Sequence, residues 1–316
     1  MPGPTAVEPK SSAPYLYLLT TMLLFGSAFA SSKVVVGDLP HQVAAALRFG
    51  GGAVILLVVA AVLRDRTRSF SRRDAVRAGF VGLLGVFGYN LFFFWGLSLA
   101  PSIDGSVIVP VLSPVLTTTA LLLSGREEAS GPRVVGLALG VVGAVVFFIG
   151  VGGVGAVADS SRLAGDVVFL LGAACWAAYS IASKKVLVGM DPLQATTCAT
   201  GVGSAALLIV AAPSLITTDW TSVSGTAWAN LVYLAIGPTA VAYLFYYHGL
   251  RTVSPSTATV MMFSVPVFGT ACAAVFLGES FTPIQLMGAV VMLVGAVLAV
   301  ARWPRRARGA ESKAVG

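Results

Sequence analysis

The chain has 316 residues, of which 57% are hydrophobic and only 10% charged, and its mean hydropathy is +0.89. Because about a quarter of the residues of an ordinary soluble domain are charged, this composition excludes a polar-shelled soluble fold and indicates an integral membrane protein. The net charge of +7 comes from short basic clusters between apolar runs. It therefore does not match a basic patch interleaved with aromatic residues, and no nucleic-acid partner is expected.

Ten apolar runs are long enough to cross a bilayer, since about 20 helical residues at about 1.5 Å each span a hydrocarbon layer about 30 Å thick. The runs cover residues 13–36, 42–63, 79–99, 102–124, 134–151, 165–188, 193–212, 227–250, 256–277 and 284–300. The sequence therefore predicts an all-α membrane protein with ten transmembrane helices.

Lysine and arginine fall on one side of this predicted membrane. The segments assigned to the inner side hold Lys10, Arg64, Arg66, Arg68, Arg72, Arg73, Arg77, Arg126, Arg133, Lys184, Lys185, Arg251, Arg302, Arg305, Arg306, Arg308 and Lys313. The outer side holds Lys33 and Arg162, and Arg48 lies inside a run. By the positive-inside rule, both termini are predicted to be cytoplasmic, and the protein is placed in the cytoplasmic membrane of the cell.

Two stretches, residues 14–151 and 164–301, repeat the same landmarks in the same order. The matched landmarks are Glu127, Gly136 and Gly143 with Glu279, Gly288 and Gly295; Pro114 with Pro266; and Gly96-Leu97 with Gly249-Leu250. Each stretch contains five predicted helices, so the second copy enters the membrane from the opposite face. Two inverted five-helix repeats are typical of secondary transporters.

These landmarks also carry a family resemblance. The residues involved are Phe25-Gly26-Ser27, Lys33, Arg48-Phe49, Pro114, Pro266, Leu277-Gly278-Glu279 and the glycines of the fifth and tenth helices. Their order in two copies, over residues 14–301, resembles the drug/metabolite transporter superfamily, specifically its ten-helix EamA-type exporters. The resemblance implies export of amino acids, related amphipathic metabolites or drugs by alternating access, without a cofactor.

Direction and energy source stay open at this stage. Import of small metabolites, or exchange of solutes such as nucleotide-linked sugars, is the alternative to export. Either proton exchange or the solute gradient could drive the export. No Asp or Glu lies in the middle of a predicted helix, since Asp104 and Asp166 are placed at outer helix ends. Because buried charge is costly, a mid-membrane carboxylate would have indicated a proton or cation site.

Candidate substrate-binding residues are one cation and a set of aromatic and polar side chains. Arg48 lies about 9 Å inside its helix, and it is either an anchor for a substrate carboxylate or a side chain that reaches the interface. The other candidates are Asn90, Phe93, Trp176, Tyr179, Ser180, Tyr243 and Tyr246. Spacings of three and four residues place Asn90 with Phe93, and Tyr243 with Tyr246, on one helical face each. Such stripes are more commonly packing or interfacial belts. The polar atoms of Asn90, Tyr243 and Tyr246 need partners in hydrocarbon, however, which favours a cavity or helix contacts for these three.

Backbone features suggest where the bundle bends and where it packs. Pro114 and Pro266 remove helical hydrogen bonds, so kinks are expected there, and we interpret both as hinges of alternating access. Glycines of the fifth and tenth helices permit close helix approach, within a monomer or across a homodimer. The small-molecule substrate and the lipid bilayer are the expected partners.

A membrane enzyme or a lipid-handling scaffold is the rival class. The chain has two histidines, His41 and His248, without a His-Glu-x-x-His run or a paired intramembrane carboxylate. Neither a metal site nor catalytic residues are therefore predicted. A Gly-x-Ser-x-Gly elbow is also missing, which disfavours a serine hydrolase.

Overall fold

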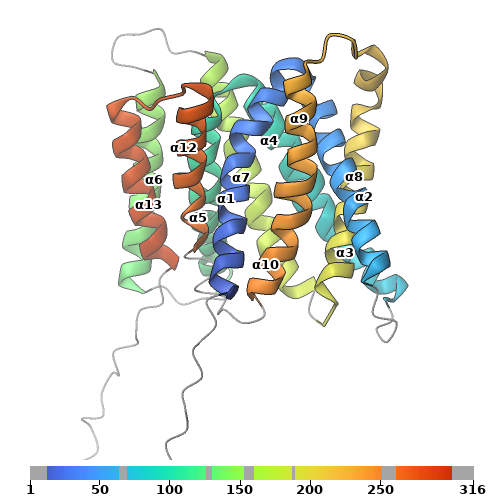
Figure 1. The fold of residues 1–316 in the computed structure, drawn as a ribbon. Coiled ribbons are helices and arrows are strands. Elements are labelled where there is room, and N and C mark those ends of the chain that lie inside the picture. Colours follow the sequence, from blue (N-terminus) through green and yellow to red (C-terminus); the bar gives the residue numbers. More distant parts are fainter. Residues whose placement is uncertain are drawn as a thin grey trace, which may run out of the picture.

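The computed structural model describes residues 13–63, 70–125, 130–152, 160–186, 189–250 and 261–300, and all regular structure within these ranges is helical. The helices are α1 (Ala13–Asp38), α2 (His41–Val62), α3 (Arg72–Gly82), η1 (Leu83–Gly88), α4 (Tyr89–Leu99), α5 (Ser102–Leu123), α6 (Gly131–Gly152), α7 (Ser160–Val186), α8 (Pro192–Thr217), α9 (Gly225–Leu234), η2 (Ala235–Val241), α10 (Ala242–Leu250), α12 (Val265–Leu277) and α13 (Pro283–Val300). They form one bundle of upright helices, and the start of α1 and the end of α13 lie at the same end of it (Figure 1). We call the opposite end the distal end.

The helices have the length and composition of membrane spans. Within the described part of the chain, seven spans are long and apolar enough to cross a bilayer: Tyr15–Asp38, His41–Val62, Arg72–Leu99, Ser102–Leu123, Ser160–Ser183, Leu193–Thr217 and Gly225–Tyr246. Three shorter apolar helices accompany them: Gly131–Phe147, Val265–Leu277 and Pro283–Leu298. Apolar side chains such as Ile149 (58% exposed) and Val275 (76% exposed) face outward, as lipid contact requires. The predicted all-α, apolar architecture is confirmed, and the count of ten crossings stays a prediction.

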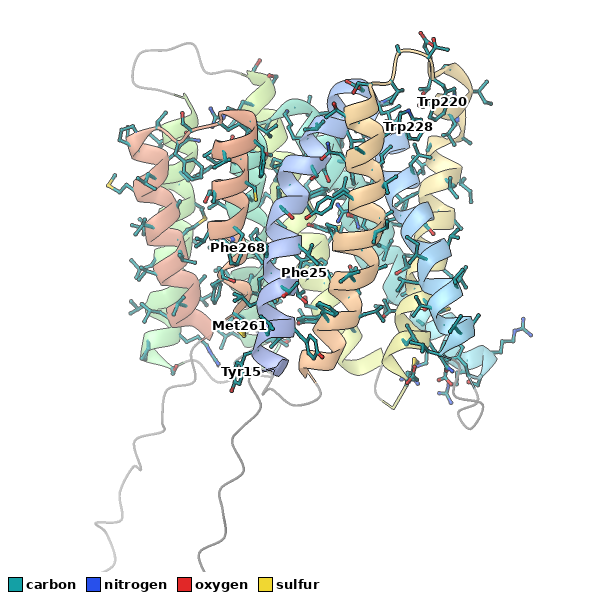
Figure 2. All side chains as sticks on the ribbon, viewed as in Figure 1. Tyr15, Phe25, Trp220, Trp228, Met261 and Phe268 are labelled. Carbon is teal, nitrogen blue, oxygen red and sulfur yellow. The ribbon has the colours of Figure 1, made fainter. Side chains whose placement is uncertain are left out.

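Aromatic side chains mark both ends of the bundle. Trp220 and Trp228 stack at the distal end with ring centroids 6.2 Å apart, and Tyr15 lies half-exposed at the other end (Figure 2). Tryptophan and tyrosine concentrate at the two interfaces of a membrane, because their rings are apolar and their N–H or O–H is polar. The long axis of the bundle is thus consistent with the membrane normal.

A short π-helical segment interrupts two of the spans at corresponding places. Aligning Gly96 with Gly249 places Gly88 opposite Val241, and these are the last residues of η1 and η2. A π turn leaves backbone carbonyls without their usual partners, and lipid offers no water to satisfy them. The Asn90 Nδ2 atom donates to the Val86 carbonyl at 2.9 Å in η1, and the Thr239 Oγ1 atom donates to the Leu234 carbonyl at 2.8 Å at η2.

Helices of the two predicted repeats pack on one another reciprocally. The first helix of the first repeat, α1, packs on α10 and α12, while the first helix of the second repeat, α7, packs on α4 and α5. The remaining equivalent helices pair directly, α2 with α8 and α6 with α13. Exchanging the two halves therefore exchanges equivalent contacts.

The α6–α13 pair depends on glycines from both helices. A Cβ atom added to Gly143 would lie 2.4 Å from the Met292 backbone nitrogen, and one added to Gly288 would lie 2.4 Å from that of Phe147. A Cβ on Gly295 would meet the Gly140 nitrogen at the same distance. The close helix approach predicted from these glycines is confirmed, and it joins two helices of one chain.

The two predicted hinges lie in different settings. Pro114 is inside α5, which runs unbroken from Ser102 to Leu123. Pro266, in contrast, lies in the first turn of α12, which follows a turn ending at Ser264. The prediction of a kink inside a continuous ninth helix is therefore wrong, because α12 begins just before Pro266. A proline in the first helical turn removes no intrahelical hydrogen bond. Residues 256–260 of that predicted helix lie outside the described residues.

The start of α12 packs closely against α1. A Cβ on Gly26 would lie 2.6 Å from the Phe268 Cβ and 2.8 Å from the Gly269 nitrogen. Figure 2 shows Phe25 and Phe268 at about mid-height of the bundle on these two helices. The interruption thus lies deep inside the membrane-spanning part, against the first helix of the other half.

Candidate functional site

Arg48 of α2 lies between the two halves of the bundle and is 7% exposed. Its Nη1 atom donates to the Oγ of Ser32 on α1 at 3.3 Å, and its Nε atom donates to the Oγ1 of Thr239 on η2 at 3.4 Å. The guanidinium group is therefore oriented inside the bundle and does not extend to the lipid interface. Thr239 can accept this bond because its hydroxyl proton is directed to the Leu234 carbonyl.

Aromatic rings surround the Arg48 guanidinium group. Its central carbon lies 4.8 Å from the ring centroid of Phe49 and 5.8 Å from those of Phe93 and Phe94. Ring faces at this distance attract a cation, more strongly where water is excluded. Within the described residues no carboxylate contacts Arg48, so its charge is held by two long hydroxyl bonds and ring faces.

A continuous row of aromatic side chains leads from Arg48 to the second half. Phe93 contacts Tyr89 (centroids 5.7 Å apart), and Tyr89 contacts Trp176 of α7 at 4.9 Å. Trp176 in turn contacts Tyr179, with ring centroids 5.2 Å apart. The structure thus brings Arg48 together with Phe93, Trp176 and Tyr179, and Tyr89 links them. Their role in substrate binding stays a prediction.

Tyr179 and Tyr243 line a pocket at the far end of this row. The pocket is small, with a cavity volume of about 10 Å³, and it lies among α3, η1, α7, α8 and α10. Gly85 admits the Tyr179 ring, because a Cβ there would lie 2.3 Å from that ring. Thr196 and Thr200 of α8 add polar atoms to the lining. Tyr243 also contacts Phe25 of α1, with ring centroids 5.8 Å apart.

Three predicted residues have other surroundings. Asn90 is fully buried, and its amide donates to backbone carbonyls of η1, so it supports the π segment. Tyr246 packs against Leu18 of α1, as does Met261. Ser180 is half-buried beside Tyr179, and its carbonyl accepts a bond from the Ser183 hydroxyl.

Sequence reasoning missed Tyr89 and Thr239. Both carried a usable signal, since Tyr89 precedes Phe93 by four residues and Thr239 precedes Tyr243 by four, which places each pair on one helical face. Thr239 was overlooked because a small residue such as threonine in an apolar run is normally interpreted as part of the core. Its role depends on η2, which local sequence does not indicate.

A second polar group, which we call the distal cluster, comprises Lys33, Asp104, Arg162, Asp166, Glu279 and Gln285. Glu279 caps α5, because its carboxylate accepts from the Ser102 nitrogen at 3.0 Å and the Ile103 nitrogen at 2.7 Å. The Lys33 Nζ atom donates to two carbonyls at the end of α4, those of Leu97 and Ala100. These bonds fix helix ends, and the Glu279 cap joins the second half to the first.

The geometry has a counterpart among known proteins. A family model described as the EamA-like transporter family matches the chain over residues 12–149 and again over residues 163–301. The chain belongs to the EamA-like transporter family. The family resemblance drawn from the sequence is therefore confirmed, and the protein is a multi-pass transporter of the cell membrane.

Curated relatives of this EamA-like transporter include both uncharacterized transporters and amino-acid exporters. The uncharacterized transporter YyaM of Bacillus subtilis is 27% identical over 288 residues, 90% of this chain and 92% of that protein. The aromatic amino acid exporter YddG of Ancylobacter novellus is 29% identical, over 79% of this chain and 84% of its own length. A probable terminal-alkyne amino-acid exporter of Streptantibioticus cattleyicolor is 24% identical, over 93% of this chain and 96% of its own.

A solved crystal structure shares the fold of the EamA-like transporter. Its TM-score is 0.62 at 23% identity, and the match covers 92% of this chain and 98% of that one. The members of this family are transporters and not enzymes. Within the described ranges, no group of three or more His, Cys, Asp or Glu side chains is arranged to hold a metal ion.

Proposed function

We propose that this EamA-like transporter exports amino acids or related amphipathic carboxylates, and that Arg48 anchors the substrate carboxylate. The observation that carries the proposal is a buried guanidinium group with no carboxylate beside it in the described structure, placed where the two halves meet. A buried unpaired cation is costly, and a carboxylate offers bonds that are shorter and stronger than those to neutral hydroxyls.

The aromatic row supplies the rest of the proposed binding surface. Phe93, Tyr89 and Trp176 offer ring faces to an apolar side chain next to the guanidinium group. Ring edges and faces favour offset or perpendicular contacts with another aromatic ring. An amphipathic substrate would thus place its carboxylate at Arg48 and its side chain along the row toward Tyr179.

The relatives support the same substrate class. Two of them are named as amino-acid exporters, one for aromatic amino acids and one for terminal-alkyne amino acids. The side chains in both names are rich in π electrons and apolar, which suits a pocket built from aromatic rings. Export is the direction that both names state, and we carry it to this chain as part of the proposal.

For the mechanism we propose alternating access between two inverted repeats, residues 14–151 and 164–301, with ten crossings and cytoplasmic termini. The reciprocal helix pairing, the position of the start of α1 and the end of α13 at one end of the bundle and the two family matches support it. Pro114 and the interruption before Pro266 are the proposed hinges. In intact cells, an impermeant thiol reagent should label a cysteine introduced at Asp219 and spare one introduced at Gly316. The reverse labelling would contradict this orientation.

The deciding experiment is counterflow in proteoliposomes with matched ligand pairs. Vesicles loaded with an unlabelled aromatic amino acid should take up the labelled one, while the corresponding decarboxylated amine should neither be taken up nor compete. Aliphatic amino acids, a purine, a sugar and a cationic dye complete the panel. Equal exchange of the amine and the amino acid would overturn the role of Arg48, and exchange of the dye or sugar alone would overturn the substrate class.

A further inference from the structure

Two carboxyl groups of the distal cluster are completely buried and come from different halves of the chain. Asp104 lies in the first turn of α5 and Asp166 in the second turn of α7, and both have 0% exposed surface. The backbone is tightly packed around them: a Cβ on Gly165 would lie 2.6 Å from that of Ala100, and one on Gly105 would lie 2.6 Å from the Phe169 ring. Water is therefore kept away from this pair.

The two carboxyl groups are unequally supplied with hydrogen-bond donors. The Asp104 carboxylate accepts from Arg162 Nε at 2.7 Å and Nη2 at 2.8 Å, and from Gln285 Nε2 at 3.3 Å. In the described structure neither oxygen of Asp166 has a hydrogen-bond partner, although its carboxyl group lies beside that of Asp104. A fully buried carboxylate without a donor is among the costliest groups a protein can hold.

The charges around the pair also indicate that Asp166 is the carboxyl group without a partner. Among the described residues, the charged groups that the packed helices direct at the pair are Lys33 from α1, Arg162 from α7 and Glu279 from the segment before α13, and α13 adds the neutral Gln285. With Asp104 and Asp166 this gives three carboxyl groups and two cations. Glu279 is held by α5 backbone donors and Asp104 by Arg162, so the surplus negative charge falls on Asp166.

We propose that Asp166 and Asp104 form a proton-binding site in which one exchangeable proton resides on Asp166 and is donated to Asp104. The proton makes the distal cluster electrically neutral and gives Asp104 another donor, so that this end of the bundle can close without water. No covalent bond other than the carboxyl O–H forms or breaks, and the proton comes from and returns to water. When the halves separate at this end, both carboxyl groups meet water and the proton leaves.

The site itself does not depend on the substrate, but its effect on transport rests on the proposed alternating access. Closure of the distal end would bind a proton and opening would release it. Acid on that side would therefore favour the closed state. This pair was not predicted from the sequence, because both residues were placed at outer helix ends, where a carboxylate would be solvated.

Infrared spectroscopy of the full-length protein in liposomes tests the site without any substrate. At neutral pH the wild type should show the carbonyl stretch of a buried protonated carboxyl group, and Asp166→Asn should remove it. Asp104→Asn should also remove it, because Arg162 would then pair with an ionised Asp166. Asp219→Asn, a change in the exposed turn between α8 and α9, is the matched control and should leave the band unchanged. A band that persists in Asp166→Asn, or its absence from the wild type, would overturn the proposal.

Two further measurements keep the test decisive. Asparagine has the shape of a protonated aspartic acid, so Asp166→Asn should unfold at the same temperature as the wild type or higher. Loss of the folded protein in that variant would show that Asp166 is needed as an anion and would contradict the proposal. In counterflow, acid on the distal side should slow the wild type and leave Asp166→Asn unaffected. If no amino acid exchanges at all, the proposed function fails while the infrared result still decides the proton site.

Discussion

The two halves of the molecule share a π segment in corresponding crossings but support it differently. In the first half a long polar side chain, Asn90, reaches back to the Gly85 and Val86 carbonyls of η1. In the second half Pro238 lies inside η2, and the short Thr239 side chain bonds to the Leu234 carbonyl. Thr239 then keeps a lone pair for Arg48. The same backbone interruption therefore serves packing in one half and the candidate site in the other.

The α5 and α12 helices differ in a related way. The α5 helix continues through Pro110 and Pro114, whereas α12 begins only at Val265, after a turn. Membrane carriers often bind solutes at discontinuous helices, because unwound backbone offers polar groups at mid-membrane depth. The second half thus holds an interrupted helix, whereas the corresponding helix of the first half is continuous. Four sets of substitutions test how the two halves differ.

The largest effect is expected where the halves are most alike, at the α6–α13 contact. Gly288→Ala should lower the unfolding free energy by about 3 kcal/mol, because its Cβ would press on the Phe147 backbone. Gly143→Ala should cost a similar amount at the reciprocal position. Gly201→Ala in α8 is the control, since a Cβ there meets nothing within 4 Å, and it should stabilise its helix by about 0.5–1 kcal/mol. Thermal unfolding in detergent measures all three, and an unstable Gly143→Ala beside an intact Gly288→Ala would break the equivalence.

The second-largest effect is expected at Arg48, the cation that contacts both halves. Arg48→Gln should weaken exchange of an amino acid by about 30-fold, corresponding to about 2 kcal/mol for a lost charge-assisted bond. The matched control, Arg77→Gln, changes a surface residue paired with Asp74 at 3.8 Å and should leave exchange unchanged. The half-saturation concentration in counterflow is compared between each variant and the wild type. Equal exchange by Arg48→Gln and the wild type would remove Arg48 from the binding site.

The support of the first π segment should matter for stability more than for affinity. Asn90→Leu keeps the branched shape of the side chain but leaves the Gly85 and Val86 carbonyls without their donor, at a cost of about 1–2 kcal/mol. The unfolding temperature should fall while the half-saturation concentration stays the same. A large loss of affinity with unchanged stability would instead assign Asn90 to the substrate, as its sequence position had suggested.

The smallest effects are expected at the second π segment, where a substitution should lower both stability and affinity. Thr239→Val removes both the bond to the Leu234 carbonyl and the acceptor for Arg48, at a cost of about 1 kcal/mol in stability and roughly a 2- to 5-fold loss of affinity. Thr239→Ser retains the hydroxyl and should restore both. A Thr239→Val protein that matches Asn90→Leu in every measurement would show that the two halves use their π segments alike.

Much of the candidate site could be read from residue types, but its connections could not. Arg48, Phe93, Trp176 and Tyr179 were chosen because a cation and rings inside apolar runs need partners, and the structure brings them together. Asn90 was chosen for the same reason, yet its partners are carbonyls of its own helix. Periodicity identifies the face on which a side chain lies, but it does not reveal a π turn that frees a carbonyl beneath it.

By itself the sequence determined the apolar helices, the repeated order of landmarks and the glycine contacts of α6 and α13, because hydropathy, spacing and the lack of a Cβ are local properties. Tertiary structure alone decided that Arg48 meets Thr239, that α12 begins after an interruption and that Asp104 and Asp166 are buried together. Those facts depend on which helices of the two halves become neighbours. The surroundings of a polar group, and with them its charge and partners, are set by residues far away in the chain.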